Sequence, residues 1–186
     1  GMGGEHIADM MGAMDMAHFE AMGADQTFAM AESMGFDQMA GMGGEHIADM
    51  MGAMDHSHFD SMGSGALSDM AMSMDMGHFE TMGADQTFAM VESMGFDQVA
   101  GMGGEHIADM MGAMDMAQVG AIGSEHIADM MSAMDTSNFQ TMGGDQTFAM
   151  VDTLGLDTVI AMGTDKVADV AVGLDMGGFQ ALGVDQ

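Results

Sequence analysis

The sequence contains no cysteine, no proline, no tryptophan and no tyrosine. Without cysteine the chain can form no disulfide, no thiolate zinc site and no cysteine nucleophile. It also lacks a charge-free apolar run of about 18 residues, so the sequence predicts no transmembrane helix. No signal peptide is visible. The absence of cysteine fits an extracellular bacterial protein.

Basic residues are almost absent as well. Lys166 is the single one, against 30 acidic residues, and the net charge at pH 7 is −29. Nucleic-acid phosphates are bound through Lys and Arg, so a nucleic-acid-binding protein is excluded. An anionic membrane surface would repel the chain. The charge predicts a solvated, self-repelling surface, and for an interaction scaffold it suggests a basic protein or a mineral surface as partner.

What the sequence does contain is an internal repeat of 20 residues. Each unit starts with a Met-Gly, Ile-Gly or Leu-Gly pair, at positions 2, 22, 42, 62, 82, 102, 122, 142, 162 and 182. Nine full units and a stub therefore fill residues 1–186 as a single continuous array. Because the chain starts on a repeat boundary and stops inside a unit, we expect it to be a fragment of a longer repetitive protein.

The unit that starts at Met2 has the apolar pattern of an amphipathic helix. Ile7, Met10, Met11 and Met14 follow the spacing i, i+3, i+4, i+7. We predict one helix over unit positions 4 to 13 and a shorter one over positions 15 to 21. Asp or Gly at position 14 separates the two, since Asp caps a following helix and Gly ends a preceding one. Gly at position 2 ends the short helix.

These helices are too short to be stable alone in water, so each must bury its apolar stripe against the next unit. The predicted fold class is therefore all-α, a superhelical solenoid of 20-residue helix–turn–short helix repeats. A strand fold is disfavoured because apolar and polar residues do not alternate and β-branched residues are few.

With its tandem, acidic, cysteine-free units, the chain resembles the repeats of very large bacterial surface and adhesin-type proteins. It is also similar to other short-helix α-solenoids. The resemblance covers the repeat character of the whole chain and rests on composition and period. It implies an extracellular or cell-surface location, in a bacterium or archaeon, and a spacer or filament role.

Methionine and histidine suggest a soft-metal site. Of the 8 histidines, seven are followed by Met four residues later, and thioether with imidazole favours Cu(I) or Ag(I). The candidate ligands are His46, Met50, His58, Met62, His106 and Met110. However, toward the C-terminus Leu154, Val170 and Leu174 occupy unit positions that hold Met in earlier units. These aliphatic side chains can still fill a core, but they offer no thioether to a metal. We therefore predict that Met is core filler and that no metal is bound.

Carboxylates at position 14 suggest a second metal hypothesis. Asp15, Asp55 and Asp75 would form a ladder of oxygen ligands, which suits Ca²⁺. Gly35 and Gly95 interrupt this ladder, which favours loose counterions. No G-x-S-x-G, S-x-x-K or H-E-x-x-H motif occurs, so the chain is predicted not to be an enzyme and to need no cofactor.

The function predicted from sequence is a non-catalytic structural repeat protein, either an extracellular stalk or a filament that self-associates through stacked repeats. The first alternative is a metal-binding protein, with Cu(I) or Ag(I) on Met/His pairs or Ca²⁺ on carboxylates. The second is a protein-interaction scaffold, because solenoids present long concave surfaces.

Overall fold

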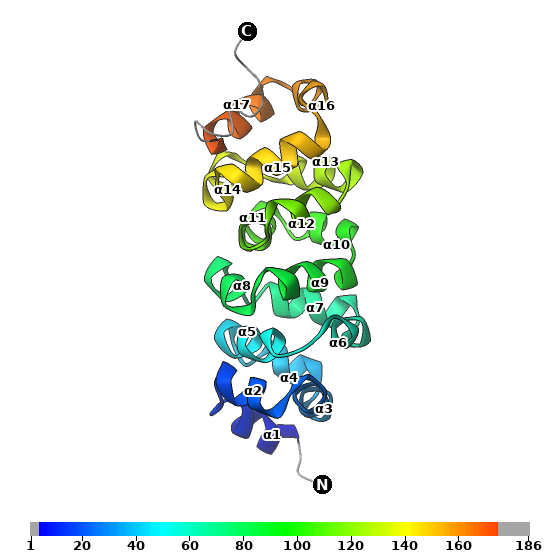
Figure 1. Cartoon of the computed structure of the whole chain (residues 1–186), viewed down its shortest axis with the longest axis vertical. Helices are drawn as coiled ribbons and strands as arrows, with labels where there is room; N and C mark the ends of the chain where they lie inside the picture. The colour runs from blue at the N-terminus through cyan, green and yellow to red at the C-terminus, as the bar shows by residue number, and fades with distance from the viewer. Residues whose placement is uncertain (1–3, 175–186) are drawn as a thin grey trace. The chain divides into compact units, whose positions relative to one another are not determined.

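The computed structural model describes residues 4–174, which form an all-α solenoid (Figure 1). Over these residues the backbone is helical between short turns, and the described range holds no β-strand. The chain divides into two compact units, Gly1–Gly95 and Phe96–Gln186, and each is considered by itself.

The helices follow the predicted alternation of a longer and a shorter segment. Those of the first unit are α1 (Gly4–Met11), α2 (Met16–Met22), α3 (Ala24–Met34), α4 (Phe36–Ala40), α5 (Gly44–Gly52), α6 (His56–Met62), α7 (Ser64–Ala71), α8 (Met76–Met82) and α9 (Ala84–Met94). Those of the second are α10 (Phe96–Gly101), α11 (Gly104–Ala113), α12 (Met116–Ala121), α13 (Ser124–Ala133), α14 (Thr136–Met142), α15 (Gly144–Leu154), α16 (Leu156–Ala161) and α17 (Thr164–Gly173). The all-α solenoid prediction is confirmed.

The helix ends lie where the repeat places Asp and Gly. Asp75 begins α8, where its carboxylate accepts the backbone N–H of His78 at 3.2 Å. Asp135 caps α14 in the same way. Gly23 ends α2, as predicted, and also begins α3, with φ 86° and ψ 158°. That backbone region is open essentially to Gly alone, so one residue closes one helix and starts the next.

The core is a line of apolar side chains between the helices. Phe19, Phe59, Phe79 and Phe139 are fully buried, and so are Met50, Met90, Met110 and Met130. At these positions the prediction that Met fills the core is confirmed. Met10, expected in the same stripe, is instead 44% exposed. It lies on α1, and among the described helices only α3 and α4 contact that helix extensively.

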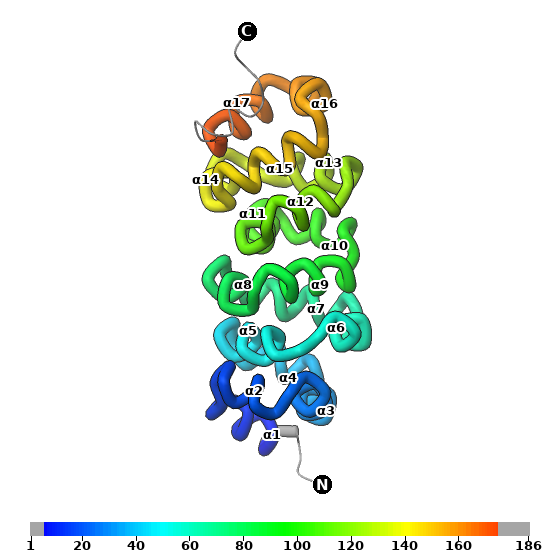
Figure 2. The backbone as a smooth tube through the Cα atoms, in the orientation of Figure 1, coloured from blue at the N-terminus to red at the C-terminus, as the bar shows by residue number. Residues whose placement is uncertain are grey.

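The helices stack on the third helix along the chain. In the first unit α5 packs on α8, α6 on α9 and α4 on α7. In the second unit α11 packs on α14, α14 on α17 and α12 on α15. Three consecutive helices therefore make one layer. Within each compact unit the backbone makes one turn per layer (Figure 2).

A layer is thus one and a half sequence units, although the repeat predicted stacking of each unit on the next. First helices of neighbouring units do touch, as α7 and α9 show. The larger contacts, however, place the longer helix of one unit on the shorter helix of another. Side-chain hydrogen bonds between layers join residues 32 to 34 apart, for example Ser93 Oγ to Asp60 Oδ1 at 2.6 Å and Gln146 Nε2 to the carbonyl of Met114 at 3.1 Å.

None of the helices in the described range is both long enough and apolar enough to cross a membrane.

Candidate functional site

The start of α6 places an imidazole between carboxylates. Asp55 caps this helix, and the Nδ1 atom of His58, three residues on, lies 3.3 Å from the backbone nitrogen of Asp55. The same Asp-x-x-His capping box begins α2 and α8. The pattern follows from the repeat. Unit position 14 supplies the capping Asp, and unit position 17 supplies the side chain that accepts the backbone N–H of that Asp.

His58 differs from its counterparts in burial and surroundings. Its side chain is 10% exposed, compared with 64% for His18 and 30% for His78. The ring lies against Phe28 of α3, with 4.7 Å between the ring centroids. His58 is therefore held between two helices.

Two carboxylates reach the buried ring. The Nε2 atom of His58 lies 3.3 Å from Asp25 Oδ1, and Nδ1 lies 2.9 Å from Asp55 Oδ1. One possible ligand atom from each of the three residues falls within 4.8 Å of the others. Within the described part of the chain, no other group of three or more His, Asp or Glu residues converges in this way. Asp25, Asp55 and His58 are called the His58 cluster below.

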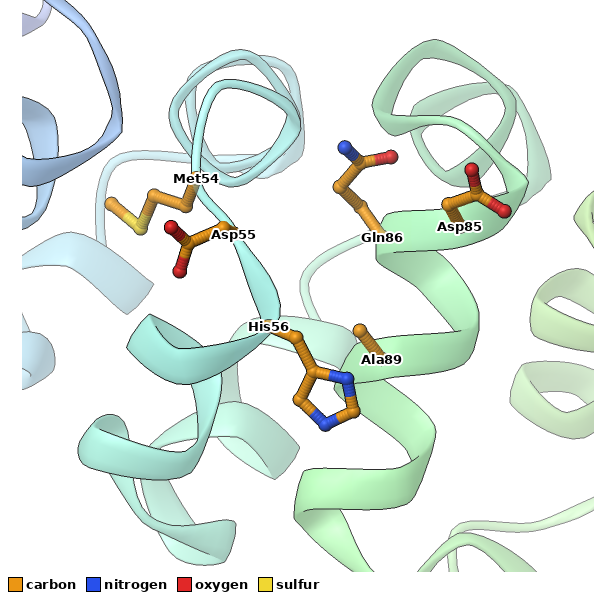
Figure 3. A pocket seen from close by; sticks show the side chains of 6 residues that line it. All are labelled: Met54, Asp55, His56, Asp85, Gln86 and Ala89. Carbon is orange, nitrogen blue, oxygen red and sulfur yellow. The ribbon is translucent and has the colours of Figure 1, made fainter.

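Two surface cavities open on either side of Asp55. One, of about 300 Å³, is lined by Met22, Gly23, Ala24, Asp25, Gln26 and Asp55. The other, of about 290 Å³, is lined by Met54, Asp55, His56, Asp85, Gln86 and Ala89. Figure 3 shows this second cavity, with His56 of α6 beside Ala89 of α9 and with Asp85 and Gln86 at the start of α9. Both cavities leave Asp55 accessible from solvent.

The capping carboxylate is ionised at neutral pH. The Ser57 hydroxyl donates to Asp55 Oδ1 at 2.7 Å, and this hydrogen bond, with the nearby His58 and two backbone N–H groups, lowers the pKa of Asp55 against a smaller effect of burial. Asp49 behaves in the opposite way. Burial, reinforced by the charge of Glu45, raises the pKa of Asp49. The carboxylate at the cap of α6 therefore keeps its negative charge more readily than Asp49 does.

The Met/His pairs predicted as soft-metal ligands are divided between core and surface. Met50 and Met110 are fully buried, and Met62 is 6% exposed. His46 and His106 are half-buried, and the Nδ1 atom of each has no hydrogen-bond partner. Buried sulfurs do not by themselves bring an imidazole to a thioether, so Cu(I) or Ag(I) binding at these pairs stays a prediction.

The expected carboxylate ladder does not form between Asp55 and Asp75. These residues begin α6 and α8, which belong to different stacks, since α6 packs on α9 and α8 on α5. The structure instead brings Asp25 to Asp55 and His58. Sequence reasoning missed Asp25 because it precedes its partners by one and a half units, a spacing that no alignment of 20-residue units displays.

No protein-family model matches this chain, and neither a curated protein nor a solved structure matches it. Function must therefore be inferred from the residues and geometry described above. An imidazole with two carboxylates can bind a cation or exchange a proton, and neither adjoining cavity is lined by a serine, threonine or lysine that could act as a nucleophile.

Proposed function

We propose that the chain is a non-catalytic structural repeat protein that serves as an extracellular stalk or self-assembling filament. The observation that carries this proposal is the recurrence of one contact, a helix on the third helix along, in most layers of both compact units. Because every layer buries apolar side chains only against its neighbours, length can increase without any change in that contact. A spacer needs this property.

Polar bonds between layers support the same role. The Gln146 side chain donates to the carbonyl of Met114, the residue that ends α11, at 3.1 Å. Lys166 donates to the carbonyl of Met134, the residue that ends α13. The last carbonyls of a helix have no partner within the helix. Gln146 and Lys166, both at unit position 5, therefore satisfy helix ends in the preceding layer and fix those layers against sliding.

A second copy of the chain is the partner that the geometry favours. Leu156 and Ile160 on α16 are 43% and 56% exposed, and Val172 on α17 is 51% exposed. Phe96, which has the same unit position as Leu156, is covered by His126 of the next layer, with 4.9 Å between the rings. The exposed side chains thus form the kind of apolar surface that a further layer covers elsewhere. A head-to-tail contact of this kind does not close, so it extends.

Sedimentation velocity of the full chain tests self-assembly. The sedimenting mass should rise with protein concentration, and also with salt, because screening is effective beyond about 8 Å at physiological ionic strength and relieves repulsion between chains of charge −29. Ile160→Glu should abolish the rise. Met72→Glu is the matched control, since Met72 is an equally exposed apolar side chain at 57% and lies on the first unit.

A wild-type chain that stays monomeric at every concentration and salt would refute self-assembly and leave the stalk form of the proposal. Equal effects of the two Glu substitutions would show that added charge alone, and not the surface on α16, controls association. Antibody labelling of intact cells would test the extracellular setting, and label that requires broken cells would contradict it.

A further inference from the structure

We propose that the His58 cluster binds one Zn²⁺ ion, with His58 Nε2 and Asp25 as protein ligands and Asp55 orienting the imidazole ring. This property goes beyond the structural role of the repeat. It uses nitrogen and oxygen donors, in contrast to the thioethers of the Met/His pairs.

The distance between the two ligand atoms fits a shared ion. His58 Nε2 and Asp25 Oδ1 are 3.3 Å apart. A charge-assisted N–H···O bond is typically shorter, about 2.7–2.9 Å. Two ligands of a tetrahedral zinc ion, each bonded at about 2.0–2.1 Å, are separated by about 3.4 Å. The pair is therefore spaced as the edge of a zinc coordination tetrahedron.

The other ring nitrogen is placed as in many metal-bound histidines. Nδ1 lies 2.9 Å from the ionised Asp55 carboxylate, closer than the 3.3 Å to the Asp55 backbone nitrogen. Zn²⁺ binding uses the tautomer in which Nδ1 carries the proton and donates it to the Asp55 carboxylate in place of accepting the Asp55 backbone N–H. In that tautomer the lone pair of Nε2 faces the Asp25 carboxylate. A cation between these two atoms would then be bound by both of them. Metal-bound histidines usually donate their second ring N–H to a carboxylate in this way.

Capping of α6 does not require an imidazole, so His58 is not explained by its capping role. Gln118 Oε1 accepts the Asp115 backbone N–H at 3.1 Å, and Asn138 Oδ1 accepts that of Asp135 at 2.8 Å. Both distances are shorter than the 3.3 Å found for His58. An amide therefore serves the cap at least as well, while only the imidazole offers a nitrogen ligand.

The surroundings suit a partly open zinc site. His58 is nine-tenths buried against Phe28, which fixes the ring. Asp25 is 98% exposed and borders the cavity of about 300 Å³, where water can complete the coordination shell. Mixed imidazole and carboxylate donors favour Zn²⁺ over Cu(I), which prefers sulfur, and over Ca²⁺, which takes oxygen ligands. The negative charge of the chain raises the local concentration of cations.

Isothermal titration of the metal-free full chain with Zn²⁺, at neutral pH and physiological salt, tests the site. We expect one ion per chain to bind more tightly than the remaining loose counterions. His58→Gln and Asp25→Asn should each weaken that binding by about tenfold or more. His78→Gln is the matched control, because His78 fills the same capping box beside Asp75, at 2.8 Å, without a third ligand group within the described residues.

These two variants distinguish the loss of a metal ligand from a loss of folding. His58→Gln reproduces the side chain that caps α12 at Gln118 and should keep the helical circular dichroism of the parent. Asp25→Asn changes an exposed residue outside the capping box. The proposal is overturned if Zn²⁺ binds without a stoichiometric step, if both variants bind as the parent does, or if His78→Gln weakens binding equally.

Discussion

Replacing Gly44 by alanine should destabilise the chain, although alanine is the better helix former. Gly44 is buried in the first turn of α5, where a β-carbon would lie 2.6 Å from the carbonyl oxygen of Ser73 and 2.8 Å from the ring of His78. Carbon–oxygen contacts in proteins are about 3.3–3.6 Å even when close. The two layers would therefore have to separate by up to about 1 Å at this point.

The expected cost follows from two opposing effects. Overpacking of a close contact costs about 1–3 kcal/mol, and alanine gains about 0.5–1 kcal/mol over glycine inside a helix. We expect a net loss of about 1–2 kcal/mol. For a chain of this size one kcal/mol shifts the melting temperature by about 2–4 °C, so Gly44→Ala should melt about 2–8 °C below the parent in far-ultraviolet circular dichroism.

Gly65→Ala is the matched control. Gly65 also lies in the first turn of a helix, α7, but no atom beyond its chain neighbours and the backbone of its own helix lies within 4 Å of the β-carbon that it would gain. The same substitution should therefore stabilise the chain by about 0.5–1 kcal/mol. If Gly44→Ala raised the melting temperature as Gly65→Ala does, the close approach between α5 and the residues before α8 would not exist, and the stacking of every third helix would be wrong.

Three further substitutions test the core, the buried hydroxyls and the caps. Met110→Leu should cost less than about 1.5 kcal/mol in thermal unfolding, because a fully buried Met that acts as core filler tolerates a similar volume; a larger loss would contradict that role. Thr87→Val should cost about 1 kcal/mol in urea unfolding, because the buried hydroxyl that donates to the Gly83 carbonyl at 2.9 Å is lost; unchanged stability would show that this bond adds nothing. Hydrogen bonds from Ser137 and from the backbone at Asn138 lower the pKa of Asp135 below 3.8, so its ionised form stabilises the fold above that pH and the effect disappears as the pH falls through the lowered pKa. The difference in melting temperature between the parent and Asp135→Asn should therefore be present at neutral pH and vanish in strong acid, and a difference independent of pH would refute the assignment.

The local structure could be predicted from the sequence because it depends on single residues at fixed unit positions. Asp75 and Asp135 mark helix starts, since a short acidic side chain satisfies the free N–H groups of a first turn. Gly23 marks a helix end, since its backbone angles exclude other residues. The buried Met and Phe positions follow from the helical period. These signals are repeated in each unit and so reinforce one another.

The layer could not be read from the 20-residue period because three helices, and not two, complete a turn. How many helices close a layer depends on packing between side chains that lie far apart in sequence. One longer-range signal was present. The segment Asp-Gln-Thr-Phe-Ala-Met recurs at Asp25, Asp85 and Asp145, an interval of 60 residues. Three sequence units equal two layers of three helices, so this interval is the one at which a residue returns to the same place in a layer.

The same mismatch hid the candidate site. Asp25 occupies unit position 4, while Asp55 and His58 occupy positions 14 and 17 of the following unit. Sequence spacing made His58 a partner for Met62, four residues on. Packing of α3 near α6 instead turns the ring toward Asp25 and Phe28. A ligand set that spans two layers becomes visible only when the register between the layers is known.

Disulfide trapping measures that register most directly, because the chain has no cysteine of its own. Asp60 and Ser93 hydrogen-bond between layers at 2.6 Å and lie 33 residues apart, whereas Ser73 and Ser93 hold the same position in consecutive sequence units. Under mild oxidation, the double variant Asp60→Cys/Ser93→Cys should form its intramolecular disulfide rapidly, and Ser73→Cys/Ser93→Cys should form it slowly or not at all. The opposite order would mean that whole 20-residue units stack on one another and would contradict a layer of three helices.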